Sequence, residues 1–518
     1  MPAWWERAVI YQIYPRSYAD SNGDGIGDLP GIVSRLDQLE WLGVDAVWLS
    51  PTFPSPNADW GYDVADYLGV HPDLGTPADL EHLIAEAARR QIRVLLDLVP
   101  NHTSDRHPWF RDPGRRDRYI WREPRPDGAA PNNWLSVFGG PAWTFDPVVG
   151  RSYLHSFLPQ QPDLDWRHED VREAFDEILR FWFDRGVAGF RIDVAHALLK
   201  DAELRDNPPA RPDESALWAR LGQWPKHNFC LPETADLHRR WRRVAAEYEP
   251  ERLLLGETYV LDFDQLLQYV VPDGLQLCMN FVFLHTPFVA VELAAVAAET
   301  ERRLPGWATP VWHVSSHDDV RFATRWCDGD EELARCALVS LLSLRGAALL
   351  YQGDEIAMEA VDVSPDRQRD LSGRDPCRTP MVWRDEDGAG FTAPGVEPWL
   401  PIGSRDRNVA AQRADPGSTL ALTRDLIALR RHRGLLTGEY EPVAAPRDVW
   451  AFRRGGGALV AVNLGARPAC LECGDGTILL CTDRGRDGEP VRGRLELEPK
   501  QTVVASAAWK TPAASSAA

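Results

Sequence analysis

Four groups of polar residues lie at the ends of apolar stretches, and their side chains are of the kinds that carry out acid–base chemistry. These residues are Asp97, Asn101 and His102 in DLVPNH, Arg191 and Asp193 in GFRID, Glu257 in GET, and His317 and Asp318 in SSHDD. A buried charge without a partner is costly, so charges in such places need a reason. Arg191 and Asp193 are two residues apart, so in a strand both side chains point to the same face.

Three of these four carboxylates, together with the arginine and the two histidines, suit the hydrolysis of a glycosidic bond. That reaction needs one carboxylate as nucleophile or base and one protonated carboxyl group as general acid. Burial and a like-charged neighbour raise the pKa of the acid. An arginine beside the nucleophile keeps it ionised, and a third carboxylate can bind sugar hydroxyls. The residue types therefore predict a glycoside-cleaving pocket, provided that the fold brings the four groups together.

The elements that must position them are eight apolar runs, most of them separated by helical patterns. The runs cover residues 8–15, 44–51, 92–102, 187–196, 252–258, 275–283, 310–319 and 347–356. Helical spacing is clear in 31–43, 77–91 and 171–186. This alternation predicts parallel strands joined by crossover helices, closed into a (β/α)₈ barrel. The polar ends of the runs would then meet at the catalytic, C-terminal face. A doubly wound open sheet is the alternative, but no glycine-rich phosphate loop follows the first run.

Breaks in the pattern predict the domain organisation. We expect the barrel to consist of residues 1–101 and 171–435. An insert at 102–170, rich in Pro, Gly and Trp, separates these two parts. A second irregular excursion covers about 360–401 of the barrel. Short strand-like runs at 436–510 indicate a C-terminal antiparallel β-domain, and 511–518 has the composition of a disordered tail.

Composition excludes several classes of protein. The 518 residues carry a net charge of −20, which argues against a nucleic-acid or membrane partner. The chain shows no signal peptide and no long apolar span, so we expect a soluble cytoplasmic protein, and a monomer by default. Cys470, Cys473 and Cys481 could be three zinc ligands, but a second pair of cysteines is missing and ordinary thiols are the favoured interpretation.

The same motifs carry a family resemblance. From about Trp4 to at least Arg430 the sequence resembles the α-amylase superfamily (glycoside hydrolase family thirteen), in particular its α-glucosidase and oligo-1,6-glucosidase branch. DLVPNH, GFRID, GE and HD occur in the family's order, together with GVDAVWLSP, QPDLDW and YQGDEI. The resemblance implies a retaining, exo-acting enzyme that releases glucose from small α-glucosides.

It also implies roles for individual residues. Asp193 would be the nucleophile, Glu257 the acid/base, and Asp318 the carboxylate that stabilises the transition state. Of the sugar-binding residues, His102, Arg191 and His317 would contact the glucose, Tyr62 would stack on its ring, and Asp59 would hold its far hydroxyls. Arg378 would pair with Asp59 to close the pocket, Phe145 and Phe157 would form its walls, and Asp97 would support the site from behind.

An acidic, glycine-rich loop near the N-terminus suggests a metal site. Asp20, Asn22, Asp24 and Asp28 alternate with residues that permit a tight turn, and oxygen ligands suit Ca²⁺. The resemblance adds the carbonyl of Ile26 and implies that the ion is structural, so no cofactor is expected for the chemistry itself. The alternative is an acidic turn without metal.

Departures from the family pattern leave the linkage open. Ser316 stands where the family often has Asn, Asp165 stands where many members have Asn, and Val194 follows the nucleophile. A transglucosylase or sucrose-isomerase-type enzyme would use the same carboxylates. A non-catalytic barrel and a starch-degrading endo-amylase are further alternatives, which the intact carboxylates and the expected closed pocket disfavour.

Overall fold

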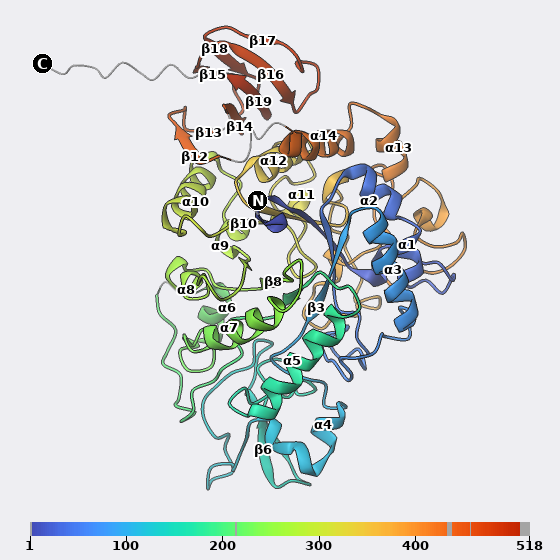
Figure 1. Cartoon of the computed structure of the whole chain (residues 1–518), viewed down its shortest axis with the longest axis vertical. Helices are drawn as coiled ribbons and strands as arrows, with labels where there is room; N and C mark the ends of the chain where they lie inside the picture. The colour runs from blue at the N-terminus through green and yellow to red at the C-terminus, as the bar shows by residue number, and fades with distance from the viewer. Residues whose placement is uncertain (1–2, 213–214, 433–437, 456, 508–518) are drawn as a thin grey trace, which may run out of the picture.

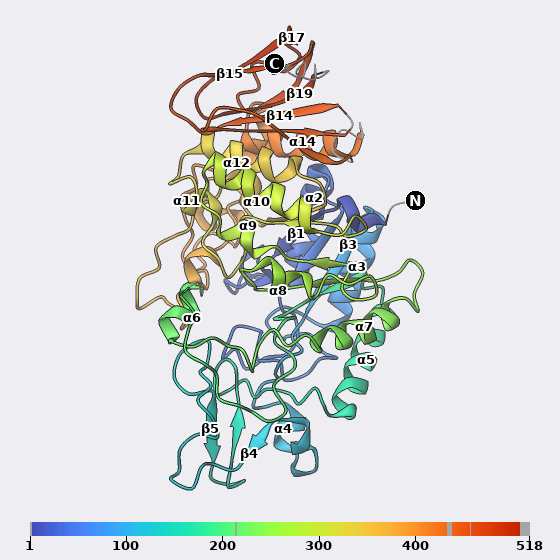
Figure 2. The same cartoon turned by 90° about the vertical axis from the view of Figure 1, so that its left-hand side faces the viewer.

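The computed structural model describes residues 3–212, 215–432, 438–455 and 457–507. The tail predicted at 511–518 lies outside these residues. Figure 1 shows three regions along the long axis: a C-terminal β-domain at one end, the barrel in the middle, and the insert at the other end. Figure 2 shows the same order from the side, with β4 and β5 of the insert farthest from the C-terminal domain.

Eight parallel strands form one sheet in the order β10-β11-β1-β2-β3-β7-β8-β9, a nearly closed barrel. They are β1 (Val9–Ile13), β2 (Ala46–Leu49), β3 (Arg93–Leu98), β7 (Gly189–Ile192), β8 (Leu253–Gly256), β9 (Leu277–Cys278), β10 (Val311–Trp312) and β11 (Ala347–Tyr351). Each lies within one of the eight predicted runs, so the predicted (β/α)₈ fold class is confirmed. In chain order β1 and β11 are the first and last strands of the barrel, and they pair directly, with Val9 opposite Ala348.

Helices connect the barrel strands, and the longer ones cover the outside of the barrel (Figure 1). They are α1 (Leu29–Val33), α2 (Leu36–Leu42), α3 (Pro77–Arg89), α5 (Glu169–Phe183), α7 (Thr234–Ala245), α10 (Ala290–Arg303), α12 (Glu331–Ser343) and α14 (Thr419–His432), with shorter α6 (Ala216–Leu221), α8 (Phe263–Leu267), α9 (Phe281–His285), α11 (Phe322–Arg325) and α13 (Val409–Ala414). Local sequence explains their limits. The start of α3, for example, is a capping box in which Thr76 and Asp79 exchange hydrogen bonds, with Pro77 in the first turn.

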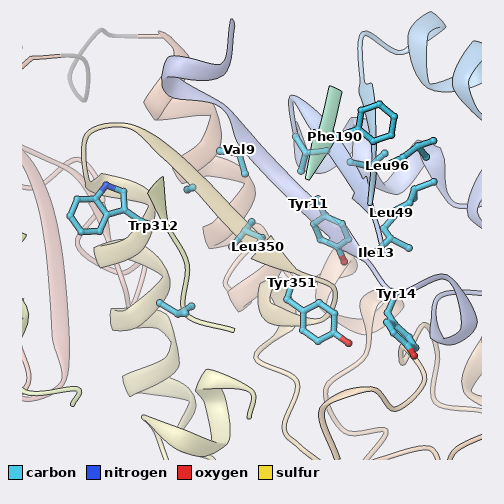
Figure 3. Packing of buried hydrophobic residues seen from close by; sticks show 14 of the residues in the cluster. Val9, Tyr11, Ile13, Tyr14, Leu49, Leu96, Phe190, Trp312, Leu350 and Tyr351 are labelled. Carbon is cyan, nitrogen blue, oxygen red and sulfur yellow. The ribbon is translucent and has the colours of Figure 1, made fainter. Parts of the chain in front are cut away.

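Alternate residues of each strand serve two cores, as the period of a strand requires. Val9, Tyr11 and Ile13 belong to the larger cluster between sheet and helices, which Figure 3 shows from close by. Ile10 belongs instead to a smaller cluster, to which most of the barrel strands contribute and which fills the barrel interior. These two packed layers fix the strand ends, and with them the residues that follow each strand.

The insert and the C-terminal domain are antiparallel. The insert holds α4 (Pro108–Arg111) and a sheet of β4 (Trp121–Arg122), β6 (Arg151–Leu154) and β5 (Trp143–Asp146). The C-terminal strands are β12 (Tyr440–Val443), β13 (Val449–Arg454), β14 (Ala458–Asn463), β15 (Ala469–Glu472), β16 (Gly476–Cys481), β17 (Pro490–Val491), β18 (Arg494–Leu497) and β19 (Gln501–Ala507). Within the described ranges, no helix is both long enough and apolar enough to cross a bilayer.

Candidate active site

The C-terminal ends of the barrel strands open into a pocket of about 230 Å³ that contains all three predicted catalytic carboxylates. Asp193 follows β7 directly, Glu257 follows β8 directly, and Asp318 lies in the segment after β10. The lining residues are Asp59, Tyr62, His102, Val137, Phe138, Phe157, Asp193, Val194, His196, Leu217, Trp218, Phe229, Glu257, Tyr259, Phe281, Asp318, Asp319 and Arg374. The barrel therefore brings together groups that are far apart in the sequence.

Arg191 joins the two carboxylates that the reaction needs. Its Nη1 lies 2.8 Å from Asp193 Oδ1, and its Nη2 lies 2.8 Å from Glu257 Oε1. The backbone N–H of Val194 donates to Glu257 Oε2 at 2.8 Å. All three charged side chains are buried, and one guanidinium holds both carboxyl groups close together.

Burial raises the pKa of both Asp193 and Glu257, and each carboxylate interacts with the other. The positive charge of Arg191 opposes this rise at both sites. Two carboxylates held this close repel each other when both are ionised, so loss of the second proton is disfavoured. A singly protonated pair would provide one acid and one anionic nucleophile.

Asp97 lies behind the pocket, in the place predicted for a supporting residue. Its Oδ1 accepts a hydrogen bond from Arg191 Nη1 at 2.8 Å. Its Oδ2 accepts one from Trp48 Nε1 at 3.1 Å and one from the Tyr62 hydroxyl at 3.2 Å. Burial raises the pKa of Asp97 to about 7. Asp97 is not among the lining residues, so it orients Arg191 and Tyr62 from behind.

Tyr62 and His317 form a stacked pair, in which Tyr62 lines the pocket and the buried His317 is not among the lining residues. Their ring centroids are 5.4 Å apart, their planes differ by 7°, and the Tyr62 hydroxyl is hydrogen-bonded to His317 Nε2. Burial lowers the pKa of His317 well below its usual range, so the ring is neutral. Gln12 Nε2 donates to His317 Nδ1 at 2.6 Å, which places the ring proton on Nε2, 3.2 Å from Asp318 Oδ2.

The prediction that Arg378 pairs with Asp59 is wrong. Arg374 makes that contact: its Nη2 lies 2.5 Å from Asp59 Oδ1, and its Nη1 lies 3.1 Å from Asp318 Oδ1. Arg378 lies behind Asp318, with Nη2 2.7 Å from Oδ1 and Nε donating to the His317 carbonyl at 2.8 Å. Both arginines occur in GRDPCRTP, four residues apart, and the sequence alone offered no reason to prefer the first.

The two arginines set the charge state of Asp318. Burial alone would raise the pKa of this carboxyl group, but the positive charges of Arg374 and Arg378 help to lower it well below its usual range. Asp318 is therefore ionised throughout the physiological range. Arg374 spans Asp59 and Asp318 and so closes one end of the pocket.

His102 and Asp59 are joined through Gln161, which sequence reasoning missed. Gln161 Nε2 lies 3.0 Å from Asp59 Oδ2 and 3.0 Å from His102 Nε2. The other partner of His102 Nε2 is the Tyr62 carbonyl at 3.1 Å. Gln161 begins QPDLDW, so that motif, already part of the resemblance, was the available signal.

One of the two predicted aromatic walls is wrong. Phe157 lines the pocket, and its ring lies 5.1 Å from that of His102. Phe145 is in β5 of the insert, is 52% exposed and is not a lining residue. Phe138 takes the place expected for it, with its ring 5.9 Å from that of Phe157 and 5.7 Å from the Arg374 guanidinium carbon. The irregular sequence of the insert gives no periodicity from which the inward-facing aromatic could be chosen.

The acidic loop suggested for calcium runs along the surface beside α1. Asp20 Oδ1 accepts the Gly23 N–H at 2.7 Å, Asn22 Oδ1 accepts the Asp24 N–H at 2.9 Å, and Asp28 Oδ1 caps α1 by accepting the Gly31 N–H at 2.6 Å. Over the described part of the chain, no three His, Cys, Asp or Glu side chains converge as a metal-binding group. The donors are hard oxygen atoms, the type that Ca²⁺ prefers, and in this arrangement they accept backbone N–H groups.

Comparison with known proteins agrees with this geometry. The model of the family described as alpha amylase, catalytic domain, matches residues 12–438, which include every pocket residue named above. The chain belongs to the α-amylase family. A probable alpha-glucosidase of Rhizobium meliloti (strain 1021) is 42% identical to this family member over 488 residues, which cover 88% of this chain and 87% of the relative. An oligo-1,6-glucosidase of Heyndrickxia coagulans is 35% identical over 496 residues, 85% of this chain and 88% of the relative.

Solved structures of other α-amylase-family enzymes superpose over nearly the whole chain. An alpha-glucosyl transfer enzyme matches with a TM-score of 0.91 and 38% identity, covering 98% of this chain and 99% of the other. The trehalulose synthase of Pseudomonas mesoacidophila MX-45 matches with a TM-score of 0.87 and 30% identity, covering 98% and 100%. An alpha-glucosyl transfer enzyme and a trehalulose synthase therefore share this architecture.

Proposed function

We propose that this chain is a retaining, exo-acting α-glucosidase that releases glucose from the non-reducing end of short α-glucosides such as maltose or isomaltose. The observation that carries the proposal is the joint engagement of Asp193 and Glu257 by Arg191, each at 2.8 Å. Retaining glycosidases place their two carboxyl groups closer together than inverting ones, which need room for a water molecule between carboxylate and sugar.

The chemistry takes two steps. In the first, the Asp193 carboxylate attacks the anomeric carbon while Glu257 gives its proton to the glycosidic oxygen, and the aglycone leaves as an alcohol. In the second, the Glu257 carboxylate accepts a proton from water, the water oxygen attacks the anomeric carbon, and the bond to Asp193 breaks. Asp318, ionised and held by Arg374 and Arg378, is positioned to accept hydrogen bonds from the sugar hydroxyls in the transition state.

The exo mode of action follows from the closed end of the pocket. Arg374 bridges Asp59 and Asp318, and Gln161 holds the other oxygen of Asp59. A chain of sugars cannot continue through this cluster of hydrogen-bonded side chains. A single terminal glucose fits the pocket, with the next sugar directed outwards past Glu257.

Transfer of the glucosyl group to a sugar is the second candidate. The outer pocket is lined by Trp218, Phe229 and Tyr259, and aromatic faces suit stacking on a second sugar ring that accepts the glucosyl group in place of water. The superposition on an alpha-glucosyl transfer enzyme and on a trehalulose synthase favours this candidate as well.

The test is to incubate the purified protein with maltose, isomaltose, sucrose, trehalose and soluble starch, following glucose release and the formation of new oligosaccharides. Asp193→Asn is the control. Glucose released from small α-glucosides but not from starch, and lost in the variant, would support the exo-glucosidase. New oligosaccharides at high substrate concentration would indicate transfer. Rapid depolymerisation of starch would contradict the closed pocket, and no reaction with any sugar would contradict the enzyme.

Structural Ca²⁺ in the acidic loop is part of this proposal. Asp20, Asn22, Asp24 and Asp28, with the carbonyl of Ile26, would supply oxygen ligands, and the loop lies outside the catalytic pocket. Metal analysis of the purified protein and the change in melting temperature on adding a chelator would test it, with Asp24→Ala as the variant. A melting temperature unaffected by chelator and calcium alike would reject the metal.

A further inference from the structure

One carboxylate in the pocket differs from the rest in having no arginine partner. Four pocket carboxylates are each held by arginine: Asp59 by Arg374, Asp193 and Glu257 by Arg191, and Asp318 by Arg374 and Arg378. Asp319 also lines the pocket, but no arginine among the described residues lies within ion-pair distance of it. Its negative charge is thus available to a ligand.

The hydrogen bonds of Asp319 leave one of its oxygen atoms unused. Ser316 Oγ donates to Asp319 Oδ2 at 2.9 Å, which orients the carboxylate. Oδ1 lies 3.8 Å from His285 Nε2, too far for a hydrogen bond. Arg325 acts on Asp319 through its charge without a direct contact, because its Nη1 and Nη2 donate to the Leu284 and Val314 carbonyls at 2.9 and 2.7 Å. The side chain is 13% exposed, and among the described side chains none donates to Oδ1.

Asp319 lies on the side of the pocket where the aglycone leaves. Tyr259, two residues after the acid Glu257, lines the pocket together with Asp319 and Phe281. The Tyr259 hydroxyl lies 3.1 Å from His285 Nε2, and the Tyr259 ring centroid is 4.5 Å from that of Phe281. Glu257 must face the glycosidic oxygen in order to protonate it, so groups adjoining Glu257 and Tyr259 face the leaving group. The Arg374 and Asp59 bridge closes the opposite, glucose-binding end.

We infer that Asp319 Oδ1 accepts a hydrogen bond from a hydroxyl group of the leaving sugar, and that Asp319 is a specificity-determining residue for the aglycone. This inference rests on the proposed glucosidase function and adds to it the recognition of the second sugar. The ligand class is a neutral, hydroxyl-bearing aglycone. An aglycone without a hydroxyl group beyond the glycosidic oxygen gains nothing from Asp319.

The experiment compares two substrates in one set of variants. Maltose and isomaltose carry hydroxyl groups on the aglycone, whereas the aglycone of p-nitrophenyl α-glucoside carries none. We expect Asp319→Ala to lower kcat/KM for the disaccharides by about 10- to 100-fold, the range for a hydrogen bond to a charged group. For the aryl glucoside we expect a change of less than about threefold. Asp319→Asn, which keeps one acceptor oxygen, should lie between wild type and Asp319→Ala for the disaccharides.

The controls separate the possible failures. Asp475→Ala removes an exposed carboxylate of the C-terminal domain and should leave both substrates unaffected. An equal loss on both substrates in Asp319→Asn would overturn the inference and assign Asp319 to the chemical step. No loss on either substrate would overturn it as well. If the wild type cleaves no α-glucoside at all, the proposed function fails, and that result is distinct from a failure of the Asp319 inference alone.

Discussion

Lys200 and Asp163 form an ion pair in the protein interior, with Nζ 3.2 Å from Oδ2 and both side chains at most 2% exposed. Asn101 completes the arrangement: its Oδ1 accepts from Lys200 at 3.0 Å, and its Nδ2 donates to Asp163 Oδ1 at 3.1 Å. Asp163 comes from the insert, Asn101 follows β3, and Lys200 lies beyond β7. These bonds join three separate segments behind His102.

Lys200→Met should destabilise the protein by about 3–5 kcal/mol, because it leaves the Asp163 carboxylate buried without its cation. Chemical denaturation followed by circular dichroism would measure the loss. Lys500→Met, which breaks a solvent-exposed pair with Asp330, is the control and should cost far less. Equal unfolding midpoints for Lys200→Met and wild type would show that the buried pair contributes little.

Arg374→Gln should lower kcat/KM for maltose by about 100-fold, since truncating one member of a buried charge pair costs 2–5 kcal/mol. Two carboxylates, Asp59 and Asp318, lose their cation at once. Steady-state kinetics would measure the effect, and Arg369→Gln, an exposed arginine of the same loop, is the matched control. Similar values of kcat/KM for maltose in Arg374→Gln and Arg369→Gln would contradict the role given to Arg374.

The pKa of Glu257 predicts how stability depends on pH. Burial raises this pKa, so the folded protein binds a proton that the unfolded chain releases at the same pH. The resulting stabilisation is complete below the unfolded-state pKa and is lost as the pH rises through the folded-state pKa. Glu257→Gln has no titrating carboxyl group at this position, so its melting temperature should rise relative to that of wild type as the pH increases from about 4, the ordinary pKa of glutamate, through the raised folded-state pKa.

Glu332→Gln, at an exposed site, serves as the control for that titration. A constant difference in melting temperature between Glu257→Gln and wild type across the range would refute the raised pKa. In the same variant kcat should fall steeply, because glutamine cannot donate the proton to the leaving oxygen. In the wild type, kcat/KM should decline at high pH as Glu257 loses that proton.

Phe138→Ala and Phe145→Ala test the corrected pocket wall. Phe138 faces the pocket, so its removal should raise KM for maltose several-fold, as expected for about 1–2 kcal/mol of lost contact with the sugar. Phe145 is half exposed in the insert, and its removal should leave KM unchanged. Initial-rate measurements on both variants would give these KM values. A larger rise in KM for Phe145→Ala than for Phe138→Ala would restore the original assignment of Phe145.

The barrel could be predicted from the sequence because its signals are local. Each strand is a short apolar run, and helices such as α5 show their buried face through the spacing of Val171, Phe175 and Ile178. The carboxylates could be predicted for the same reason, since Asp193 and Glu257 immediately follow strands. Their convergence needs only the rule that parallel strands end on one face of a barrel.

The remaining parts of the site depend on loops, whose sequences show no helical or strand periodicity from which their course could be predicted. Arg374 and Arg378 share one motif, and only the path of the 360–401 excursion decides which of them reaches Asp59. The insert places Phe138 in the pocket by a turn that follows no helix or strand rule, whereas Phe145 lies outside the pocket on the short strand β5. The recognition of the aglycone that we infer for Asp319 depends on the absence of an arginine within ion-pair distance among the residues that the structure describes, which a sequence cannot display.

The pairing of β1 with β11 has a consequence for how activity is acquired. Val9 lies opposite Ala348, so the ring of strands is completed only when the two ends of a segment of more than three hundred residues meet. Contacts of such long sequence separation form slowly. We expect this pairing to form late in refolding from denaturant. Circular dichroism should then recover before glucose release does, because the pairing of β1 with β11 also brings Arg374, which lies beyond β11, to Asp59, which lies beyond β2. Catalytic activity is then a direct reporter of the last stage of folding.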